Sequence, residues 1–193
     1  MDAPLILAST SPYRRALLER LGLGFTAVAP TCDEEALKTR WPQPRELAEG
    51  LAFEKARCIA DAHPEATVIG SDQVACCDDR VLGKPGDRQR ASEQLAALAG
   101  RSHRLITAVS VIADGQVLSH TDITVLHMRA LDPATIARYV AADDPVDCAG
   151  AYKLEQRGIA LFERIESADH SAITGLPLIA LCGILRQLGY IVP

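Results

Sequence analysis

The chain has 193 residues, of which 48% are apolar and 23% carry charged side chains. These values are typical of one globular domain, and they exclude collagen-like and disordered chains. With 20 basic and 25 acidic residues the formal net charge is -5, which excludes the extended basic surface that long nucleic acid requires. A small anionic ligand needs only a local basic cluster and is compatible with this charge. We therefore expect a single domain over residues 1–193 that does not bind long nucleic acid.

The sequence also bears on the compartment. The longest apolar run near the C-terminus, residues 178–185, is far shorter than the roughly 20 residues that span a bilayer. Asp2 stands where a secretory signal would be basic, and the apolar residues 5–7 are too few for such a signal. We expect a cytoplasmic protein that does not contact a membrane.

The spacing of cysteines and histidines does not indicate a metal site. The six cysteines include no C-x-x-C pair, and neither they nor the five histidines follow a zinc pattern. Without an export signal, the cysteines are expected to be free, mostly buried thiols. The histidines are expected at the surface or in loops.

The first half of the chain alternates between strand and helix signals. Ser11 and Pro12 are favoured at the N-cap and at the first position of a helix, and Gly22 ends that helix. We predict strands over residues 3–8, 25–29 and 66–70, helices over 12–21 and 45–62, and a polar loop over 30–44.

The second half contains a hairpin between further helices. Asp114 and Gly115 separate two apolar-rich segments and form a typical tight turn. We predict an extended segment over 74–77, a turn at 78–79, a loop over 83–86, helices over 87–99, 132–141 and 176–188, and strands over 105–113, 116–128 and 159–165. Because strands and helices interleave but the hairpin is antiparallel, the expected fold class is α/β with a mixed sheet.

Lys55 occupies an unusual position in the helix predicted over residues 45–62. At about 100° per residue the apolar side chains form one face, and Lys55 falls near its middle. That face consists of Leu47, Leu51, Cys58, Ile59 and Ala62. A lysine placed there either extends along its stem to water or meets a negative partner. The sequence leaves both possibilities open.

Hydroxyl and arginine side chains gather where the first strand meets the first helix. Ser9 and Ser11 lie in the loop, and Arg14 and Arg15 lie in the first turn of the helix. A helix N-terminus presents free N–H groups, and arginines add donors suited to phosphate oxygens. The pattern indicates either an anion site or an ordinary cap followed by solvated arginines. Since the loop lacks the glycines of G-x-G-x-x-G or a P-loop, it supports neither dinucleotide nor Walker-type binding.

Acidic residues suggest the chemistry of this candidate site. Asp72 follows the strand over 66–70, where α/β folds gather ligands, although a lone aspartate there also forms turns. Asp33 and Glu34 offer a second carboxylate or form a solvated loop, and Lys84 either binds phosphate or is a loop lysine. Cations that hold phosphates, together with two carboxylates that hold Mg²⁺ or Mn²⁺, are the parts needed to cleave a phosphoanhydride.

A series of short motifs follows along the chain. They are Leu7–Arg15 (LASTSPYRR), Asp33-Glu34, Glu54–Ala56 (EKA), Gly70–Gln73 (GSDQ), Gly83–Pro85 (GKP), Cys148–Tyr152 (CAGAY) and Gly175–Leu178 (GLPL). In this order, over nearly the whole chain, they resemble the Maf (septum-formation-inhibitor-like) nucleotide pyrophosphatases. The resemblance implies an elongated mixed α/β fold of the inosine-triphosphate-pyrophosphatase type, with two lobes around a cleft. It also implies a nucleoside triphosphate pyrophosphatase that uses a divalent metal cation, Mg²⁺ or Mn²⁺.

The resemblance also implies roles for individual residues. Asp72 matches the catalytic acid, acting as general base or as metal-bound carboxylate, and Glu34 matches the acidic residue that holds the metal with it. The residues that match phosphate-binding positions are Ser9, Arg14, Arg15, Lys55 and Lys84.

Tyr13, Gln73 and Glu155 occupy the positions that separate branches of the family. They resemble the branch that acts on 7-methyl-GTP. An aromatic ring such as Tyr13 can stack on a cationic methylated purine, and a carboxylate such as Glu155 can pair with its N–H donors or its charge. The expected reaction is hydrolysis of 7-methyl-GTP to 7-methyl-GMP and pyrophosphate, through attack of water at the α-phosphorus.

Two alternatives stay open. One is hydrolysis of dTTP and UTP by the same kind of site. The other is a nucleotide-binding regulator of cell division that does not hydrolyse its ligand, although a pure binder has little need of Asp72 beside Lys55 and Glu34. In each case the partner is a small-molecule nucleotide, and the family suggests a homodimer.

Overall fold

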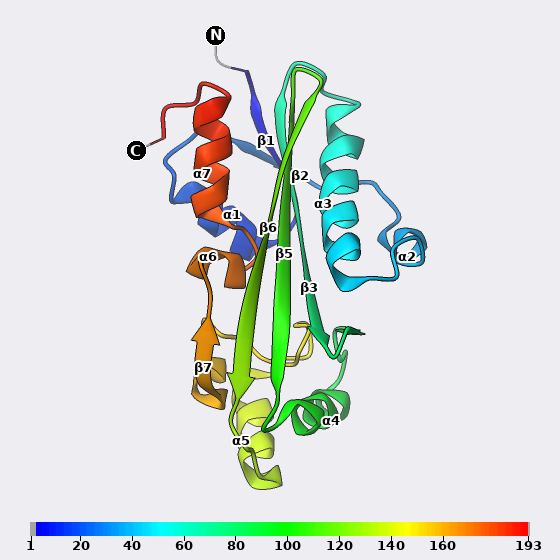
Figure 1. Cartoon of the computed structure of the whole chain (residues 1–193), viewed down its shortest axis with the longest axis vertical. Helices are drawn as coiled ribbons and strands as arrows, with labels where there is room; N and C mark the ends of the chain where they lie inside the picture. The colour runs from blue at the N-terminus through cyan, green and yellow to red at the C-terminus, as the bar shows by residue number, and fades with distance from the viewer. Residues whose placement is uncertain (1–2, 193) are drawn as a thin grey trace. The chain divides into compact units, whose positions relative to one another are not determined.

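The computed structural model describes residues 3–192, except for the side chain of Lys38 (Figure 1). The elements in chain order are β1 (Leu5–Ala8), α1 (Pro12–Glu19), β2 (Thr26–Val28), α2 (Glu34–Lys38), α3 (Pro44–Ala60), β3 (Thr67–Cys77), β4 (Arg80–Leu82), α4 (Arg88–Leu98), β5 (Ser102–Ala113), β6 (Gln116–Met128), α5 (Pro133–Asp143), the 3₁₀ helix η1 (Arg157–Leu161), β7 (Phe162–Glu166), α6 (His170–Ile173) and α7 (Leu178–Gln187).

The strands form one seven-stranded sheet. Their order is β2-β1-β3-β5-β6-β7, and β4 pairs with β3 outside this path. β1 runs parallel to β2 and β3, whereas β4 is antiparallel to β3 and β7 is antiparallel to β6. The sheet is open, with β2 and β7 at its ends. This confirms the predicted α/β class with a mixed sheet.

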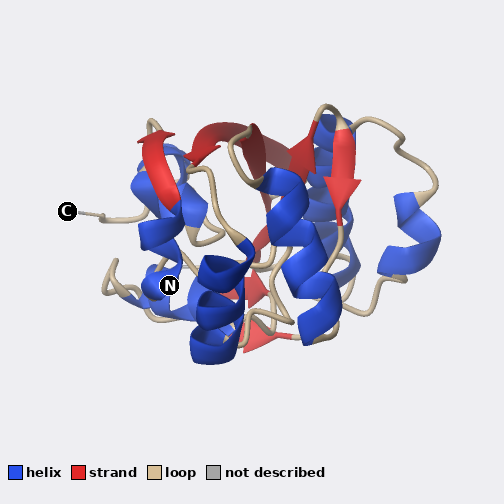
Figure 2. Cartoon of the chain, turned by 90° about the horizontal axis from the view of Figure 1, so that it is seen from below, coloured by secondary structure: helices blue, strands red, loops and turns tan. Residues whose placement is uncertain are grey.

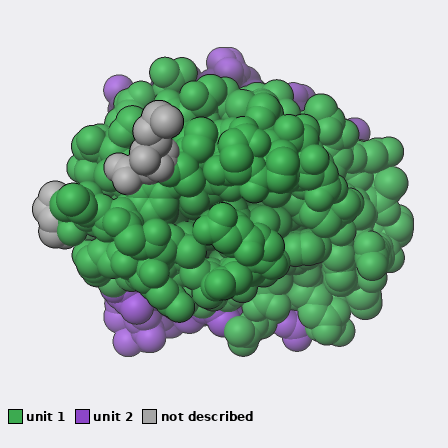
Figure 3. Space-filling view, turned by 90° about the horizontal axis from the view of Figure 1, so that it is seen from above, with its two compact units in different colours: residues 1–73, 107–122, 169–193 green, residues 74–106, 123–168 purple. Residues whose placement is uncertain are grey.

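Contacts within the chain divide it into two compact units (Figure 3). Unit 1 consists of residues 1–73, 107–122 and 169–193, and unit 2 of residues 74–106 and 123–168. The division therefore falls within β3, β5 and β6. No helix within residues 3–192 is both long enough and apolar enough to cross a membrane.

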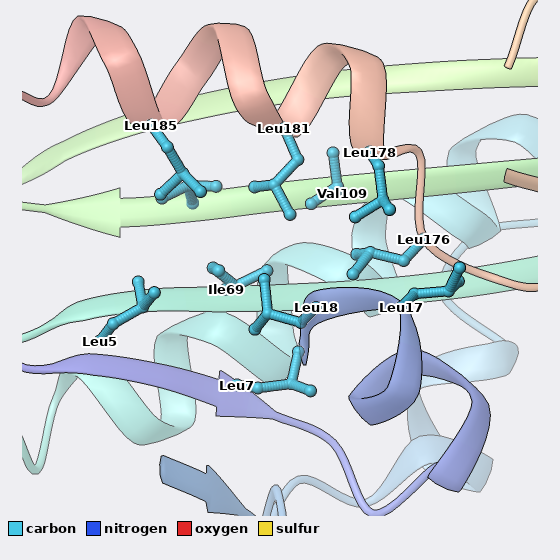
Figure 4. Packing of buried hydrophobic residues seen from close by; sticks show 11 residues of the cluster. Leu5, Leu7, Leu17, Leu18, Ile69, Val109, Leu176, Leu178, Leu181 and Leu185 are labelled. Carbon is cyan, nitrogen blue, oxygen red and sulfur yellow. The ribbon is translucent and has the colours of Figure 1, made fainter. Parts of the chain in front are cut away.

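Unit 1 buries apolar side chains on both faces of its strands. Successive side chains of a strand point to opposite faces, and β1 shows this directly: Leu5 and Leu7 join one cluster, and Ile6 and Ala8 join another. The first cluster includes side chains of α1 and α7 (Figure 4), and the second includes side chains of α3. Helices therefore cover both faces of these strands (Figure 2).

Gly70 on β3 allows α3 to lie close to the sheet. A Cβ atom at this position would lie 2.2 Å from the carbonyl oxygen of Ala52 and 2.6 Å from the amide nitrogen of Ala56, both on α3. Ala52 and Ala56 are themselves buried. Because Lys55 lies in the same stretch of α3, this close approach brings the lysine to the sheet.

β3 is longer than the sequence predicts. The polar residues Ser71, Asp72 and Gln73 indicate the end of a strand, yet β3 continues over residues 67–77, and Asp72 lies in its interior. Hydrogen bonds to the neighbouring strand explain the difference, because Ser71 and Gln73 both donate to oxygen atoms of β5. Once paired in this way, polar side chains no longer oppose burial within a strand.

Short elements account for the remaining differences. The segment expected as a loop over 30–44 contains α2, which begins where Asp33 accepts a hydrogen bond from the Ala36 amide at 3.1 Å. The sequence does not predict β4, η1 or α6, and β7 covers residues 162–166 instead of 159–165. Such short elements carry too little periodicity to be detected from the sequence.

The cysteines are only partly as expected. All six are free thiols, which confirms the prediction, but Cys76 and Cys77 alone are buried and the other four are partly exposed.

The expectation that the histidines lie at the surface or in loops is wrong for His103. This residue, on β5 in unit 2, is 2% exposed. Its Nε2 lies 2.7 Å from the hydroxyl of Tyr152, and Phe162 contacts both rings. Its Nδ1 has no hydrogen-bond partner among the described residues. The imidazole is buried because it packs as an aromatic ring while one nitrogen pairs with a hydroxyl.

We expect Gly70→Ala to destabilise the protein. The added Cβ would overlap the backbone of α3, and such overpacking costs about 1–3 kcal/mol. Urea denaturation measures the free energy of unfolding. Gly24→Ala is the matched control, since a Cβ at Gly24 meets no atom within 4 Å, and it should change stability by less than about 0.5 kcal/mol. Equal stability of the two variants would contradict the close approach of α3.

We also expect His103 to make the protein sensitive to acid. Burial, assisted by His127, lowers the pKa of His103 from 6.5 to about 4. The unfolded state therefore binds this proton more readily, so the contribution of His103 to stability is full above pH 6.5 and is lost as the pH falls from 6.5 towards 4. At about 1.4 kcal/mol per pKa unit, the loss between pH 7.5 and pH 4.5 is roughly 2–3 kcal/mol.

Urea titrations at several pH values test this expectation. His103→Gln, which keeps a hydrogen-bonding side chain but does not titrate, should lose less stability on acidification than the unsubstituted protein. His120→Gln, at an exposed position, should retain the original pH dependence. Parallel profiles for the protein and His103→Gln would refute the role of His103.

Candidate functional site

Lys55 meets two carboxylates inside unit 1. Its Nζ lies 2.7 Å from Asp72 Oδ1 and 3.1 Å from Glu34 Oε1, and the residue is only 6% exposed. The lysine comes from α3, Asp72 from β3 and Glu34 from α2. Of the two possibilities that the sequence leaves open, the structure therefore shows a negative partner.

Local structure explains why these side chains converge. α3 begins with Pro44 at its first position, and it presents Lys55 towards β3 through the close approach at Gly70. Glu34 is the first residue of α2, directly after its N-cap Asp33. A buried lysine is stable only when paired, so Lys55 fixes where the three elements meet.

Arg14 adds a second cation. It lies in the first turn of α1, and its Nε donates to the Gly175 carbonyl at 2.8 Å. Burial lowers the pKa of the Arg14 guanidinium, while the charges of Asp72 and Glu34 raise it. The same two carboxylates therefore act on Arg14 and on Lys55. We call Arg14, Glu34, Lys55 and Asp72 the charged cluster.

The other candidate residues in and just before α1 lie in different environments. Ser9 is buried, and its Oγ accepts a hydrogen bond from the Ser11 amide at 3.1 Å. Arg15, by contrast, has a side chain that is 63% exposed, and its Nε donates to Glu19 Oε1 at 3.1 Å. No contact among the described residues joins Arg15 to the charged cluster. Tyr13 is half-buried in the first turn of α1.

Gln73 is held with a defined orientation next to Asp72 on β3. Its Nε2 donates to Thr107 Oγ1 at 2.9 Å and to the carbonyls of Ala172 and Ile173 at 2.9 and 3.0 Å. Because the two carbonyls only accept, the amide nitrogen must point towards them. The Gln73 Oε1 is therefore the atom available for another partner.

Lys84 and Glu155 belong to unit 2. Both are exposed, and neither forms an ion pair with a described residue. The turn that carries Glu155 is anchored, because the amide of Lys153 donates to the hydroxyl of Tyr139 at 2.9 Å. That Lys84 and Glu155 act with the charged cluster stays a prediction.

The charged cluster contains two carboxylates that could bind a magnesium-type ion. Within residues 3–192 no group of three or more His, Cys, Asp or Glu side chains could hold a metal. Mg²⁺, however, commonly takes one or two carboxylates and completes its shell with water and substrate phosphates. Glu34 and Asp72 provide that number of carboxylates, and both of them contact Lys55.

Sequence reasoning assigns no role to Gly175, which contacts Arg14, or to Ser71, which contacts Gly175. The Gly175 carbonyl accepts from Arg14 and also from Ser71 Oγ, at 2.9 Å. Gly175 opens the GLPL motif, and its φ of +111° is a conformation that favours glycine. That motif is the signal from which a backbone role could have been inferred.

The amino-acid sequence is similar to a protein family and to several named proteins. Residues 4–188 match the family described as Maf-like protein. A protein named 7-methyl-GTP pyrophosphatase from Xanthomonas axonopodis pv. citri is 49% identical over 189 residues, covering 98% of each chain. Proteins of the same name from Bdellovibrio bacteriovorus and Alkalilimnicola ehrlichii are 48% and 47% identical, over 95% and 97% of this chain and 96% and 94% of theirs. The chain therefore belongs to the Maf-like protein family.

Proposed function

We propose that this chain is a nucleoside triphosphate pyrophosphatase that hydrolyses 7-methyl-GTP to 7-methyl-GMP and pyrophosphate. The charged cluster is the observation that carries the proposal, because Lys55 pairs with Asp72 and Glu34 beside Arg14. Cations beside carboxylates are what a site needs to hold a triphosphate and activate water. The name shared by relatives at 47% to 50% identity supports the choice of nucleotide.

In this proposal Arg14 and Lys55 bind phosphate oxygens. Because the Gly175 carbonyl holds Nε of Arg14, the two Nη groups are the donors left for the substrate. Lys55 contacts two carboxylates, and it exchanges one of these contacts for a phosphate oxygen when the nucleotide binds. The further phosphate-binding residues in the proposal are Ser9, Arg15 and Lys84.

Asp72 activates the attacking water. Its Oδ1 accepts from Lys55 Nζ, so Oδ2 is left to orient the water and, in the general-base role, to take its proton. The water oxygen bonds to the α-phosphorus, the bond from that phosphorus to the α,β-bridging oxygen breaks, and pyrophosphate leaves. Mg²⁺ or Mn²⁺, held by Glu34 and Asp72, would neutralise phosphate charge and lower the pKa of bound water. In the alternative role Asp72 acts as the carboxylate of that metal.

Three residues are proposed to select the base. Tyr13 stacks on the cationic methylated purine, and Glu155 pairs with its N–H donors or its charge. Gln73 offers Oε1, an acceptor, because its amide nitrogen is already bonded to oxygen atoms of unit 1. The single domain over residues 1–193 stays a prediction from length and composition. Two lobes around a cleft and a homodimer stay predictions from the family resemblance.

A panel of nucleotides tests the proposed function. The purified protein is incubated with Mg²⁺ or Mn²⁺ and with 7-methyl-GTP, GTP, dTTP or UTP, and released pyrophosphate is measured. We expect the highest kcat/KM with 7-methyl-GTP. Faster hydrolysis of UTP or dTTP would overturn the choice of nucleotide. Binding without hydrolysis of any nucleotide would favour a regulator.

Substitutions in the charged cluster test the mechanism. Asp72→Asn keeps the shape but removes the base or metal ligand, so we expect kcat to fall by about 100- to 10,000-fold. Lys55→Ala should abolish most activity too, and it should also destabilise the fold by about 3–5 kcal/mol, because it leaves Asp72 without its buried partner.

Glu65→Gln, which changes an exposed acid, is the control and should keep full activity. Circular dichroism establishes that each variant is folded at the assay temperature. Near-normal kcat in folded Asp72→Asn would remove Asp72 from the mechanism.

A further inference from the structure

The turn between α6 and α7 holds the guanidinium of Arg14. The Gly175 carbonyl accepts a hydrogen bond from Arg14 Nε at 2.8 Å and another from Ser71 Oγ at 2.9 Å. Ser71 is fully buried, and its Oγ also lies 2.8 Å from the Ala108 carbonyl on β5. A hydroxyl has one proton, so Ser71 shares it between two carbonyls and ties Gly175 to the sheet.

The backbone at Gly175 is built for this contact. Its φ of +111° is rarely adopted by residues with a side chain. A Cβ there would also lie 3.4 Å from Arg14 Nε and 3.7 Å from its Nη2, next to the atoms that the carbonyl holds. These are ordinary van der Waals distances, so it is the positive φ of the turn that requires glycine here.

Buried polar groups fix the two ends of the same turn. Asp169, which is 4% exposed, accepts from the Ser171 amide at 2.9 Å and from the Ile179 amide at 2.7 Å. The hydroxyl of Ser171 accepts from the Leu178 amide at 2.8 Å. The turn that contains Gly175 is therefore held by hydrogen bonds at both ends. These bonds fix the direction of the Gly175 carbonyl without a ligand.

We propose that Gly175, through its carbonyl, and Ser71 are positioning residues for Arg14. The Gly175 carbonyl occupies Nε and so fixes the plane of the guanidinium, and Ser71 holds that carbonyl in place. Both Nη groups are left for two oxygens of a phosphate. An arginine has five N–H donors in a rigid fork, so Nε can be held while the others bind the ligand. The inference rests on the proposed function insofar as it takes Arg14 to be a phosphate-binding residue.

A double-mutant cycle tests this coupling with inorganic tripolyphosphate, a probe whose binding does not depend on hydrolysis. Its dissociation constant is measured by calorimetry for the unsubstituted protein, Ser71→Ala, Arg14→Ala and the double variant. Loss of one orienting hydrogen bond should weaken binding about fivefold in Ser71→Ala. In the Arg14→Ala background, the same Ser71→Ala change should have no further effect. A merely structural role of Ser71 would give the same loss in both backgrounds.

Ser110→Ala is the matched control. Ser110 is a buried serine on β5 whose hydroxyl pairs with Ser119 and does not contact Arg14. It should leave tripolyphosphate binding unchanged. Gly175→Ala, assayed in the same cycle, should also lose its effect when Arg14 is removed.

The outcomes separate this inference from the proposed function. Additive effects of Ser71→Ala and Arg14→Ala overturn the positioning role alone. Unchanged binding in Arg14→Ala overturns both the positioning role and the phosphate-binding role of Arg14. Coupled binding effects in a protein that hydrolyses no nucleotide would support the positioning role while the proposed function fails.

Discussion

The ammonium group of Lys55 is buried because two carboxylates surround it, and the arrangement of the site depends on that pairing. An uncompensated charge in this position would oppose folding strongly. Pairing with Asp72 joins α3 to β3, and pairing with Glu34 brings α2 to the same point. The helix α2 is short and has few apolar residues, and this ion pair attaches it to α3. The charged residues of the candidate site are thus also residues that hold α2, α3 and β3 together.

Local rules account for the elements that the sequence predicts well. Ser11 does cap α1, and Asp114 and Gly115 do form a left-handed turn between β5 and β6. Helical periodicity places Lys55 on a buried face, and the structure confirms it. These features depend on residues close together in the chain, where spacing and propensity carry the information.

The features that the sequence does not predict depend on distant residues. Asp72 lies inside a strand because tertiary hydrogen bonds satisfy the polar side chains on either side of it. The contact between Arg14 and the Gly175 carbonyl joins residues that are 161 positions apart. Because the partner is a backbone atom, side-chain periodicity does not reveal it, and the glycine of the GLPL motif is the one signal in the sequence that points to it. Within the site, the charged side chains could be predicted from the sequence, but the pairing of Arg14 with the Gly175 carbonyl is not predicted.

The pairing of Lys55 with both carboxylates means that the site has an internal counter-ion. The ammonium of Lys55 offsets one of the two negative charges of Glu34 and Asp72, and as part of the chain it is always present. A carboxylate pair that lacked such a cation would repel itself and would need an external ion to become compact. Here Lys55 reduces that repulsion from within the polypeptide, so Glu34 and Asp72 can lie on either side of one ammonium group without an added ion.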